Sequence, residues 1–172
     1  GQWNPAPFEA VHLGSIPTEL VAAALFGFEK GAHSKADKSQ KGILEKCHKG
    51  AVFFDEIAEL PKSTQVALLR CLQEGKVRPL GAPRDVDAHP RILSATHQSL
   101  PEQVEQGAFR RDLYHRLSAV MIEIPPLRAR PSDIPLIAEH ILVDVEASER
   151  GPLLESVKNW LAEHPTTEGD RA

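Results

Sequence analysis

Apolar and polar positions along the chain predict buried strands that alternate with amphipathic helices. Phe8–Val11, Ala51–Phe54 and Arg91–Thr96 are short segments rich in apolar residues and bounded by polar or turn residues, as strands are. Ala51–Phe54 is apolar at every position, which predicts a strand buried on both faces. Ala119–Ile124 predicts one more strand. The order of the elements is typical of an α/β domain with a mostly parallel sheet.

Helical spacing predicts helices between these strands. Thr18 is a candidate N-cap for a helix that continues to Leu25, and Pro17 directly precedes it. A second helix is predicted over Ser63–Glu74, with Gly75 as its C-cap. Its predicted buried face consists of three apolar residues: Val66, Leu69 and Leu72.

A third helix is predicted near the C-terminus, beginning at Ser132 or Asp133 and carrying Pro135 in its first turn. Its predicted buried face consists of Ile134, Ile137 and Ile141.

Two further segments contain turn residues rather than helical spacing. Arg78–Asp87 predicts a hairpin or loop, and Gly27–Lys38 is a long polar loop rich in lysine. Such a loop inside a compact domain is usually functional or disordered.

Composition narrows the class of protein. The 172 residues suffice for one domain with a core, and 41% of them are hydrophobic. No apolar run is long enough to span a membrane, and no secretory signal is visible, so we expect a cytoplasmic protein without a membrane partner. The net charge of −4 gives no reason to expect direct DNA binding. The two cysteines, Cys47 and Cys71, predict reduced thiols rather than a disulfide framework.

Two charged clusters are candidates for chemistry. Asp55 and Glu56 directly follow an apolar strand, where nucleotide hydrolases place one carboxylate on Mg²⁺ and one on the attacking water. The alternative is a strand that simply ends in solvated charges. Phe109–Leu117 holds Arg110 and Arg116, which could reach the phosphate of a neighbouring subunit. The alternative there is a solvated helix face with local ion pairs.

Five segments occur in a fixed order along the chain. They are Phe26–Ala32, Phe53–Pro61, Leu68–Gly75, Phe109–Leu113, and Pro125–Arg130 with Asp133–Pro135. Their order and spacing resemble consecutive blocks of the AAA+ domain of bacterial sigma-54-dependent transcriptional activators, the enhancer-binding proteins. The resemblance covers about positions 7 to 142. It implies a three-layer αβα P-loop NTPase-like (AAA+) core with a mostly parallel sheet, followed by part of a helical lid.

The resemblance also implies a function and a set of site residues. The family consists of ring-forming ATPases that use ATP and Mg²⁺ to remodel the closed complex of sigma-54 RNA polymerase. Asp55 matches the magnesium ligand and Glu56 the residue that activates water, while Arg110 and Arg116 match the arginine fingers that act between associated subunits. His97 stands at the sensor I position, and an ungapped extension puts Arg171 at the sensor II arginine; both would contact the nucleotide.

Departures from the family pattern fall on functional positions. The loop that contacts sigma-54, GAFTGA in the family, is here Gly31, Ala32, His33, Ser34, Lys35 and Ala36. His12 stands where the family usually has an asparagine that restrains the glutamate, and His97 replaces another asparagine. Arg78–Arg84 falls on a second hairpin that moves with the contact loop.

The largest departure concerns the phosphate-binding loop. A glycine-rich turn ending in Gly-Lys-Ser/Thr is expected before Phe8, and the sequence does not contain one. The only Gly-Lys pair, Gly75-Lys76, is followed by valine. We therefore expect residues 1–130 to be a partial AAA+ core and residues 131–172 a partial lid with a polar tail. We also expect this chain alone neither to bind ATP tightly nor to hydrolyse it.

Three functions remain open from the sequence. The first is that of a sigma-54 interaction domain in its family role, present as a truncated and divergent copy. The second is that of a non-catalytic interaction module that docks on intact activator rings through Arg110 and Arg116. The third is a decayed gene remnant without function.

Overall fold

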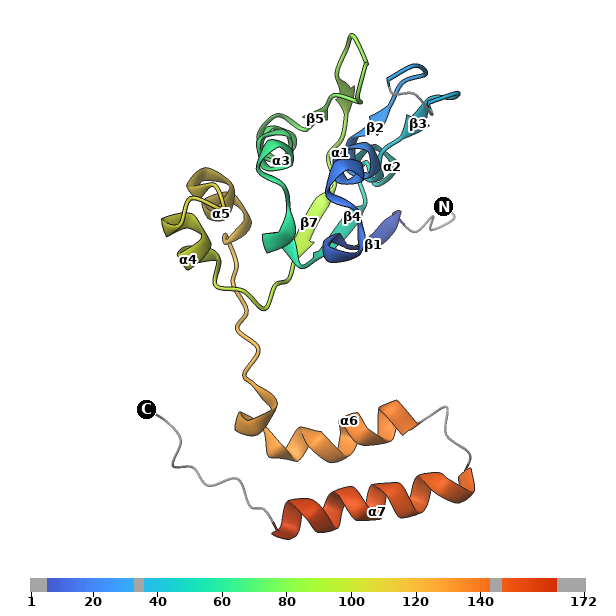
Figure 1. Ribbon diagram of the computed structural model, residues 1–172, viewed down its shortest axis with the longest axis vertical. Helices are drawn as coiled ribbons and strands as arrows, with labels where there is room; N and C mark the ends of the chain where they lie inside the picture. Colours follow the sequence, from blue (N-terminus) through green and yellow to red (C-terminus); the bar gives the residue numbers. More distant parts are fainter. Residues whose placement is uncertain (1–5, 33–35, 143–146, 164–172) are drawn as a thin grey trace, which may run out of the picture. The chain divides into compact units, whose positions relative to one another are not determined.

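Three parallel strands form the central sheet of the computed structural model, in the order β1-β4-β7 (Figure 1). They are β1 (Phe8–His12), β4 (Ala51–Asp55) and β7 (Arg91–Ser94). Both crossovers step in the same direction across the sheet, so the helices between the strands lie on one side of it. The strands predicted at these three places are confirmed, and so is the α/β class with a parallel sheet.

The structure describes residues 6–32, 36–142 and 147–163, and the chain divides into two compact units, 1–121 and 122–172. The first unit contains the helices α1 (Thr18–Phe26), α2 (Ile43–Lys46), α3 (Lys62–Glu74), α4 (Leu100–Glu105) and α5 (Arg111–Leu117). The second contains α6 (Ile134–Ile141) and α7 (Ala147–Glu163). Short 3-10 turns occur at Leu13–Ser15, Ile57–Glu59, Leu127–Ala129 and Pro131–Asp133.

The sheet is packed on one face. Val52 and Phe54 are completely buried in the core, together with Val11 of the neighbouring strand. The alternate positions face the other way, and there Phe8 is 63% and Leu93 47% exposed. The prediction that β4 is buried on both faces is therefore wrong, because none of the described helices covers that second face as α1 and α3 cover the first.

Helix α3 follows its prediction in extent, and of its predicted buried face Leu69 is buried and Leu72 packs against the core. It spans Lys62–Glu74 and ends at Gly75, whose left-handed backbone (φ +66°) confirms the predicted C-cap. Its buried residues are Thr64, Gln65, Leu68, Leu69 and Cys71. Val66 was expected on this face and is instead 50% exposed. The buried face of α3 includes Gln65 in place of Val66, because the side-chain amide of Gln65 makes its hydrogen bonds inside the core.

The predicted N-cap of α1 is displaced by one residue. Helix α1 begins at Thr18 itself with Pro17 in the cap position, so the prediction of Thr18 as N-cap is wrong by one residue.

Cys47 and Cys71 are both free thiols inside the core, as predicted. Burial raises the pKa of the Cys71 thiol to about 11.

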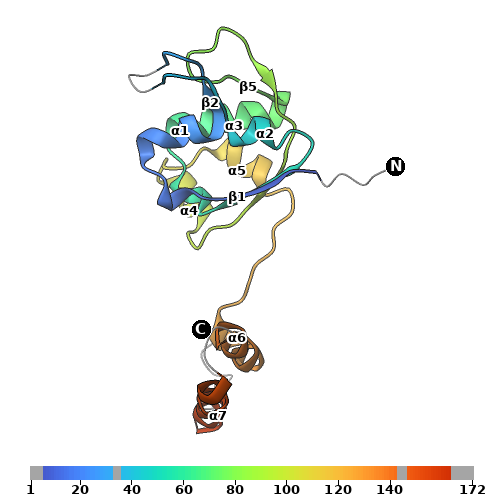
Figure 2. The same cartoon turned by 90° about the vertical axis from the view of Figure 1, so that its right-hand side faces the viewer.

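Two β-hairpins project from the same end of the first unit (Figures 1 and 2). One joins β2 (Gly27–Phe28) to β3 (Gln40–Lys41), and the other joins β5 (Lys76–Val77) to β6 (Val86–Asp87). The second confirms the hairpin predicted over Arg78–Asp87. A parallel bridge between Phe28 and Leu80 holds the two hairpins together.

The largest departures from the predicted elements lie between residue 119 and the C-terminal helices. No strand forms over residues 119–124, where Val120 and Ile122 are 81% and 82% exposed. Helix α6 begins at Ile134 as expected, but its predicted buried face is wrong: Ile141 is 69% exposed. Helix α7 was not predicted at all. None of the helices in the described ranges has the length and apolar character needed to cross a membrane.

Candidate functional site

The carboxyl edge of the sheet carries the candidate acids. Asp55 is the last residue of β4, and Glu56 follows it with a left-handed backbone (φ 55°, ψ 53°). This conformation costs a non-glycine residue on the order of 1–3 kcal/mol, so the surrounding bonds must hold it. Two backbone hydrogen bonds do so. Ala95 donates to Phe54 at 2.8 Å, and Ile57 donates to Ala95 at 3.0 Å.

Asp55 is paired with a histidine from the adjacent strand. His12 and Asp55 are direct partners in the β1–β4 register, and their side chains therefore share one face of the sheet. The Nδ1 atom of His12 lies 3.1 Å from Oδ2 of Asp55. The other carboxylate oxygen, Oδ1, accepts a 3.1 Å hydrogen bond from the backbone N–H of Glu56. The Asp55 side chain remains 45% exposed.

Glu56 is paired with a different histidine. The Nδ1 atom of His97 lies 2.7 Å from Oε1 of Glu56, and the hydroxyl of Thr96 donates to Oε2 at 3.3 Å. The hydrogen bond from His97 is the main cause that holds the pKa of Glu56 below its usual range. Glu56 is therefore ionised at neutral pH. The structure thus brings Asp55, Glu56 and His97 together at one edge, as the sequence predicts.

Arg110 lies just before α5 and forms a fork with Asp112. Its Nε donates to Oδ1 at 3.0 Å and its terminal nitrogen donates to Oδ2 at 2.6 Å. This pairing raises the pKa of Arg110 and lowers that of Asp112. The backbone N–H of Arg110 donates to the buried amide oxygen of Gln65 at 2.9 Å. A local ion pair, the alternative left open by the sequence, therefore forms between Arg110 and Asp112.

Arg116 contacts a different element. Its guanidinium donates a 3.1 Å hydrogen bond to the backbone carbonyl of Leu72, which lies in the last turn of α3. A cation is favourable there because the last carbonyls of a helix lack partners within the helix. In the part of the chain that the structure describes, neither Arg110 nor Arg116 is bonded to Asp55 or Glu56.

The expected sigma-factor contact loop lies in the β2–β3 hairpin. Gly31 adopts φ +83° and donates a 2.8 Å backbone hydrogen bond to Ala36, which closes the loop. Ala32 faces the other hairpin, since a Cβ added at Gly81 would lie 3.0 Å from its side chain. The remaining predicted loop residues, His33, Ser34 and Lys35, lie outside the described residues, and so does Arg171.

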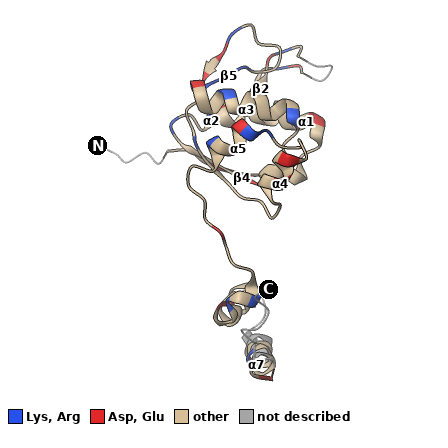
Figure 3. Ribbon diagram, turned by 90° about the vertical axis from the view of Figure 1, so that its left-hand side faces the viewer, with Lys and Arg blue, Asp and Glu red and all other residues tan. Residues whose placement is uncertain are grey.

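Charges on the first unit are mixed in sign, with basic and acidic positions interspersed on the hairpins and helices (Figure 3). The best-defined ion cluster lies between α3 and the β5–β6 hairpin. Asp85 there accepts from Arg70 at 2.7 Å and from Arg78 at 2.6 Å. The cluster attaches the hairpin to the helix, and the Asp85 side chain is only 17% exposed.

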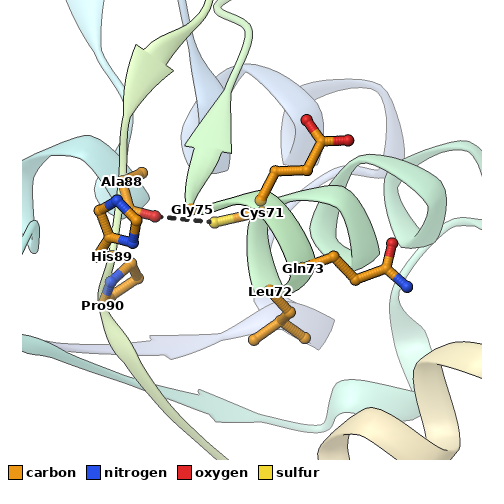
Figure 4. Close-up of a pocket in the computed structure, with 8 residues that line it drawn as sticks. Cys71, Leu72, Gln73, Gly75, Ala88, His89 and Pro90 are labelled. Atoms are coloured by element: carbon orange, nitrogen blue, oxygen red, sulfur yellow. Dashed lines mark hydrogen bonds between the residues drawn. The ribbon is translucent and has the colours of Figure 1, made fainter.

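A cavity of about 230 Å³ lies beside the end of α3 (Figure 4). Cys71, Gly75 and His89 are among its lining residues, and the Cys71 thiol donates to the carbonyl of Ala88 at 3.6 Å. His89 precedes β7, whereas the candidate acids follow the carboxyl end of β4. The cavity therefore lies at the opposite end of the parallel strands from the acids, and it is not part of the candidate site.

The sequence interpretation missed two polar residues that organise the site. Thr96 binds Glu56, and Gln65 fixes the backbone of Arg110. Thr96 was expected only as the end of a strand. Gln65 could have been found from spacing, because Gln65, Leu68, Leu69 and Leu72 follow the i, i+3, i+4, i+7 pattern of one helix face.

Comparison with known proteins places this arrangement in a family. Residues 1–123 match the model of the sigma-54 interaction domain. The transcriptional regulatory protein GlrR of Escherichia coli K12 is 46% identical over 147 residues, which are 86% of this chain and 33% of GlrR. The response regulator protein PilR of Pseudomonas aeruginosa is 45% identical over 136 residues, which are 79% of this chain and 31% of PilR.

A solved structure shows the same fold. NtrX from Brucella abortus, crystallised in complex with ADP, superimposes with a TM-score of 0.71 at 37% identity, over 80% of this chain and 29% of NtrX. The fold is that of an AAA+ nucleotide-binding domain of transcriptional regulators. The chain belongs to the sigma-54 interaction domain family. It spans about a third of the length of these relatives.

Proposed function

We propose that this chain is the sigma-54 interaction domain of a bacterial enhancer-binding regulator and that it engages sigma-54 RNA polymerase in the cytoplasm. The coupled hairpins carry this proposal. Glu29 donates to Leu80 at 2.9 Å, and Leu80 donates to Gly27 at 2.9 Å. These bonds join the loop that contains Gly31 to the β5–β6 hairpin, so that both present one contact surface. In this proposal residues 1–130 form the AAA+ core and residues 131–172 part of the lid.

Binding of purified sigma-54 to the full chain tests the proposal. Ala32→Asp places a charge where the two hairpins meet and should abolish binding measured by fluorescence anisotropy. Lys38→Ala is the matched control, because Lys38 is exposed in the same hairpin but lies outside the contact segment Gly31–Ala36. Both variants should retain the melting transition of the unchanged chain. Equal sigma-54 binding by all three proteins would overturn the proposal.

The carboxylates suit a magnesium ion. A carboxylate has about four lone-pair positions, and the two hydrogen bonds to Asp55 leave acceptor capacity on both of its oxygens. Oxygen donors of this kind are the ligands that Mg²⁺ prefers. In the family role Asp55 would hold Mg²⁺, Glu56 would act on the attacking water, His97 would contact ATP, and Arg110 and Arg116 would reach an adjacent subunit. Bound Mg²⁺ would supply charge for phosphoryl transfer.

These 172 residues do not include the phosphate-binding loop of the family. No Gly-x-x-x-x-Gly-Lys-Ser/Thr sequence occurs in them, so the backbone N–H groups and lysine that hold a triphosphate are not provided. We therefore expect no tight ATP binding by this chain alone. Isothermal calorimetry with ATP and Mg²⁺ checks this, and hydrolysis of ATP that Glu56→Gln abolishes would contradict it.

A second candidate function is that of a non-catalytic subunit that docks on related activators. Arg110 and Arg116 lie on one exposed segment, and they could dock on the intact subunits of a related activator ring without any nucleotide on this chain. Such a chain would act as an inhibitory subunit. Titrating it into a working activator should then lower the ATPase rate of the activator, and an unchanged rate at saturating chain would exclude this role.

Self-association is proposed on a separate observation. The open face of the sheet exposes Phe8 and Leu93 at 63% and 47%. Exposed apolar surface beside an edge strand favours pairing between copies. Sedimentation velocity should show a species larger than a monomer that grows with concentration, and Leu93→Lys should reduce it. A single monomer at all concentrations would contradict this proposal.

A further inference from the structure

One edge of the central sheet is open in the part of the chain that the structure describes. Strand β7 is the last in the order β1-β4-β7 and pairs there with β4. The backbone N–H groups of Arg91 and Ala95 donate to the β4 side of the sheet, each at 2.8 Å. Successive residues of a strand direct their backbone groups to opposite edges. The N–H and C=O groups of Ile92 and Ser94 therefore point away from β4, toward the open edge.

A second segment of the chain has the character of a strand and no ladder. Val120, Met121, Ile122 and Ile124 are between 65% and 82% exposed. Residues 120–124 belong to none of the ladders among the described residues, and their ribbon carries no arrow in Figure 1. Valine and isoleucine are residues that favour strands. The chain thus has an open strand edge and a strand-forming segment that its own sheet does not use.

An antiparallel register fits the segment to this edge. With Ile122 opposite Ile92 and Val120 opposite Ser94, both pairs exchange their backbone hydrogen bonds, because Ile92 and Ser94 direct these groups outward. Residues directly opposite each other share one face of a sheet. Ile92 packs against the core, so Ile122 would extend the same apolar face.

The same register brings complementary side chains together on the other face of the sheet. Met121 then lies opposite the exposed Leu93, and Glu123 lies opposite Arg91. Arg91 and Glu123 are both exposed, and opposite charges directly across two strands stabilise their pairing. A parallel register that joins Glu123 to Arg91 would instead place Pro125 opposite Leu93, and proline lacks the N–H that the ladder needs. The side chains therefore favour the antiparallel pairing.

Prolines limit the two segments at the same end. Pro90 directly precedes β7, and Pro125 directly follows the 120–124 segment. In the antiparallel register Pro90 lies opposite Ile124, so both chains lose a backbone donor where the ladder ends. The pairing is therefore short, and its length is set by the sequence on both sides.

We propose that two copies of this chain associate by strand exchange, in which residues 120–124 of each copy add to β7 of the other as an antiparallel strand. The inference rests on the self-association proposed above and names its interface. A second copy is the partner because each copy carries both the open edge and the matching segment. Two such contacts are equivalent under a two-fold axis and close into a dimer.

Disulfide trapping of the full chain tests the register. The chain with Arg91→Cys is mixed with the chain with Glu123→Cys and oxidised, so that a bond between these positions is necessarily intermolecular. Opposite residues in this type of antiparallel pair have Cα atoms about 4.5 Å apart, which suits a disulfide. A covalent dimer with one copy of each chain is expected by mass spectrometry. Mixing Arg91→Cys with Met121→Cys is the matched control, and preferential bonding of that pair, or of neither, overturns the proposal.

Proline substitution tests whether backbone pairing is required. Ile122→Pro removes the N–H that bonds to Ile92, so the dimer should be lost in sedimentation velocity. Met121→Pro is the matched control, because the N–H of Met121 points away from β7 in this register and the dimer should remain. Both variants should keep the melting transition of the unchanged chain, since residues 120–124 belong to no ladder of the described sheet. Equal association of the unchanged chain and Ile122→Pro contradicts strand exchange.

Charge reversal separates this interface from simple packing of the open sheet faces. Arg91→Glu places like charges opposite each other at both contacts and should weaken dimerisation about tenfold. Adding Glu123→Arg to the same chain should restore it. If the double variant stays weak while Leu93→Lys still reduces association, the chain associates through its open face and strand exchange is wrong. An unchanged chain that is monomeric at all concentrations would overturn self-association itself, and sigma-54 binding bears on neither result.

Discussion

The buried side chain of Gln65 accepts a 2.9 Å hydrogen bond from the backbone N–H of Arg110. Its amide nitrogen also donates to the carbonyls of Leu60 at 2.9 Å and Ala108 at 3.1 Å. One side chain on α3 therefore fixes the segment that begins α5 and carries the candidate arginine finger. Gln65 is 1% exposed, so none of these groups could turn to water without a structural change.

Replacing Gln65 with leucine should destabilise the fold. The substitution removes the partner of three backbone groups, of which the Leu60 carbonyl is buried and the Ala108 carbonyl and Arg110 N–H are partly buried. Each costs up to the order of 1 kcal/mol, so we expect a loss of about 1–3 kcal/mol. Urea unfolding followed by circular dichroism measures it. Gln73→Leu is the matched control, since Gln73 is exposed on the same helix and should change stability by less than about 0.5 kcal/mol. Equal effects of the two substitutions would show that the buried hydrogen bonds contribute little.

Much of the first unit could be predicted from local patterns. Apolar runs located β1, β4 and β7, and Gly75 marked the end of α3, because these signals depend on neighbours in sequence. Part of the buried face of α3 was missed because Gln65 is polar by type and yet buried by its hydrogen bonds. Hydrophobicity alone leaves out such a residue, and only its helical spacing with Leu68 and Leu69 indicates that it shares their face.

The apolar segment near residue 120 illustrates a second limit. Its composition predicts a strand, but a strand requires a partner whose backbone groups it can pair with. The ladders of the described chain join β1-β4-β7, β2-β3 and β5-β6, and none of them includes residues 119–124. The candidate site shows the same limit. Asp55 and Glu56 were found from one strand end, but the assignment of His12 to Asp55 and of His97 to Glu56 depends on the order of the strands.

Asp85 should make the stability of the chain depend on pH. The hydrogen bond from Arg78, followed by the charge of Arg70, holds the pKa of Asp85 below its usual range. A carboxyl group whose folded pKa is depressed stabilises the fold above its unfolded pKa of about 3.9, and this stabilisation is lost as the pH falls through the folded value. Asp85→Asn should therefore lower the melting temperature at neutral pH, and the difference from the unchanged chain should shrink below about pH 4.

Thermal unfolding at a series of pH values measures this dependence. Asp87→Asn provides the matched control, because Asp87 lies two residues away in the same hairpin and is exposed. It should leave the curve of melting temperature against pH nearly unchanged. A difference between Asp85→Asn and the unchanged chain that stays constant down to pH 3 would mean that the ion cluster is not the source of the effect.

Gly75 should not tolerate a side chain. Its φ of +66° costs an L-residue about 1 kcal/mol, and an added Cβ would lie 1.8 Å from Cε1 of His89. Gly75→Ala should therefore lower the free energy of unfolding by more than this backbone cost alone. Combining it with His89→Ala removes the clash and should restore part of the loss. If the double variant is no more stable than Gly75→Ala, after correction for His89→Ala alone, the clash is not the cause.

Substitutions of Arg110 and Arg116 should distinguish a contribution to fold stability from a contact with a neighbouring subunit. Arg110 pairs with Asp112 on the surface, where solvent screens the pair, and Arg116 donates to the last turn of α3. Arg116→Ala should therefore reduce stability by about 0.5–1.5 kcal/mol, and Arg110→Ala by less. Both should weaken inhibition of an intact activator ring, whereas the control Arg111→Ala should preserve it. If Arg116→Ala alone loses inhibition, and regains it when the fold is stabilised by cooling, its role is the α3 contact rather than a contact with the neighbouring subunit.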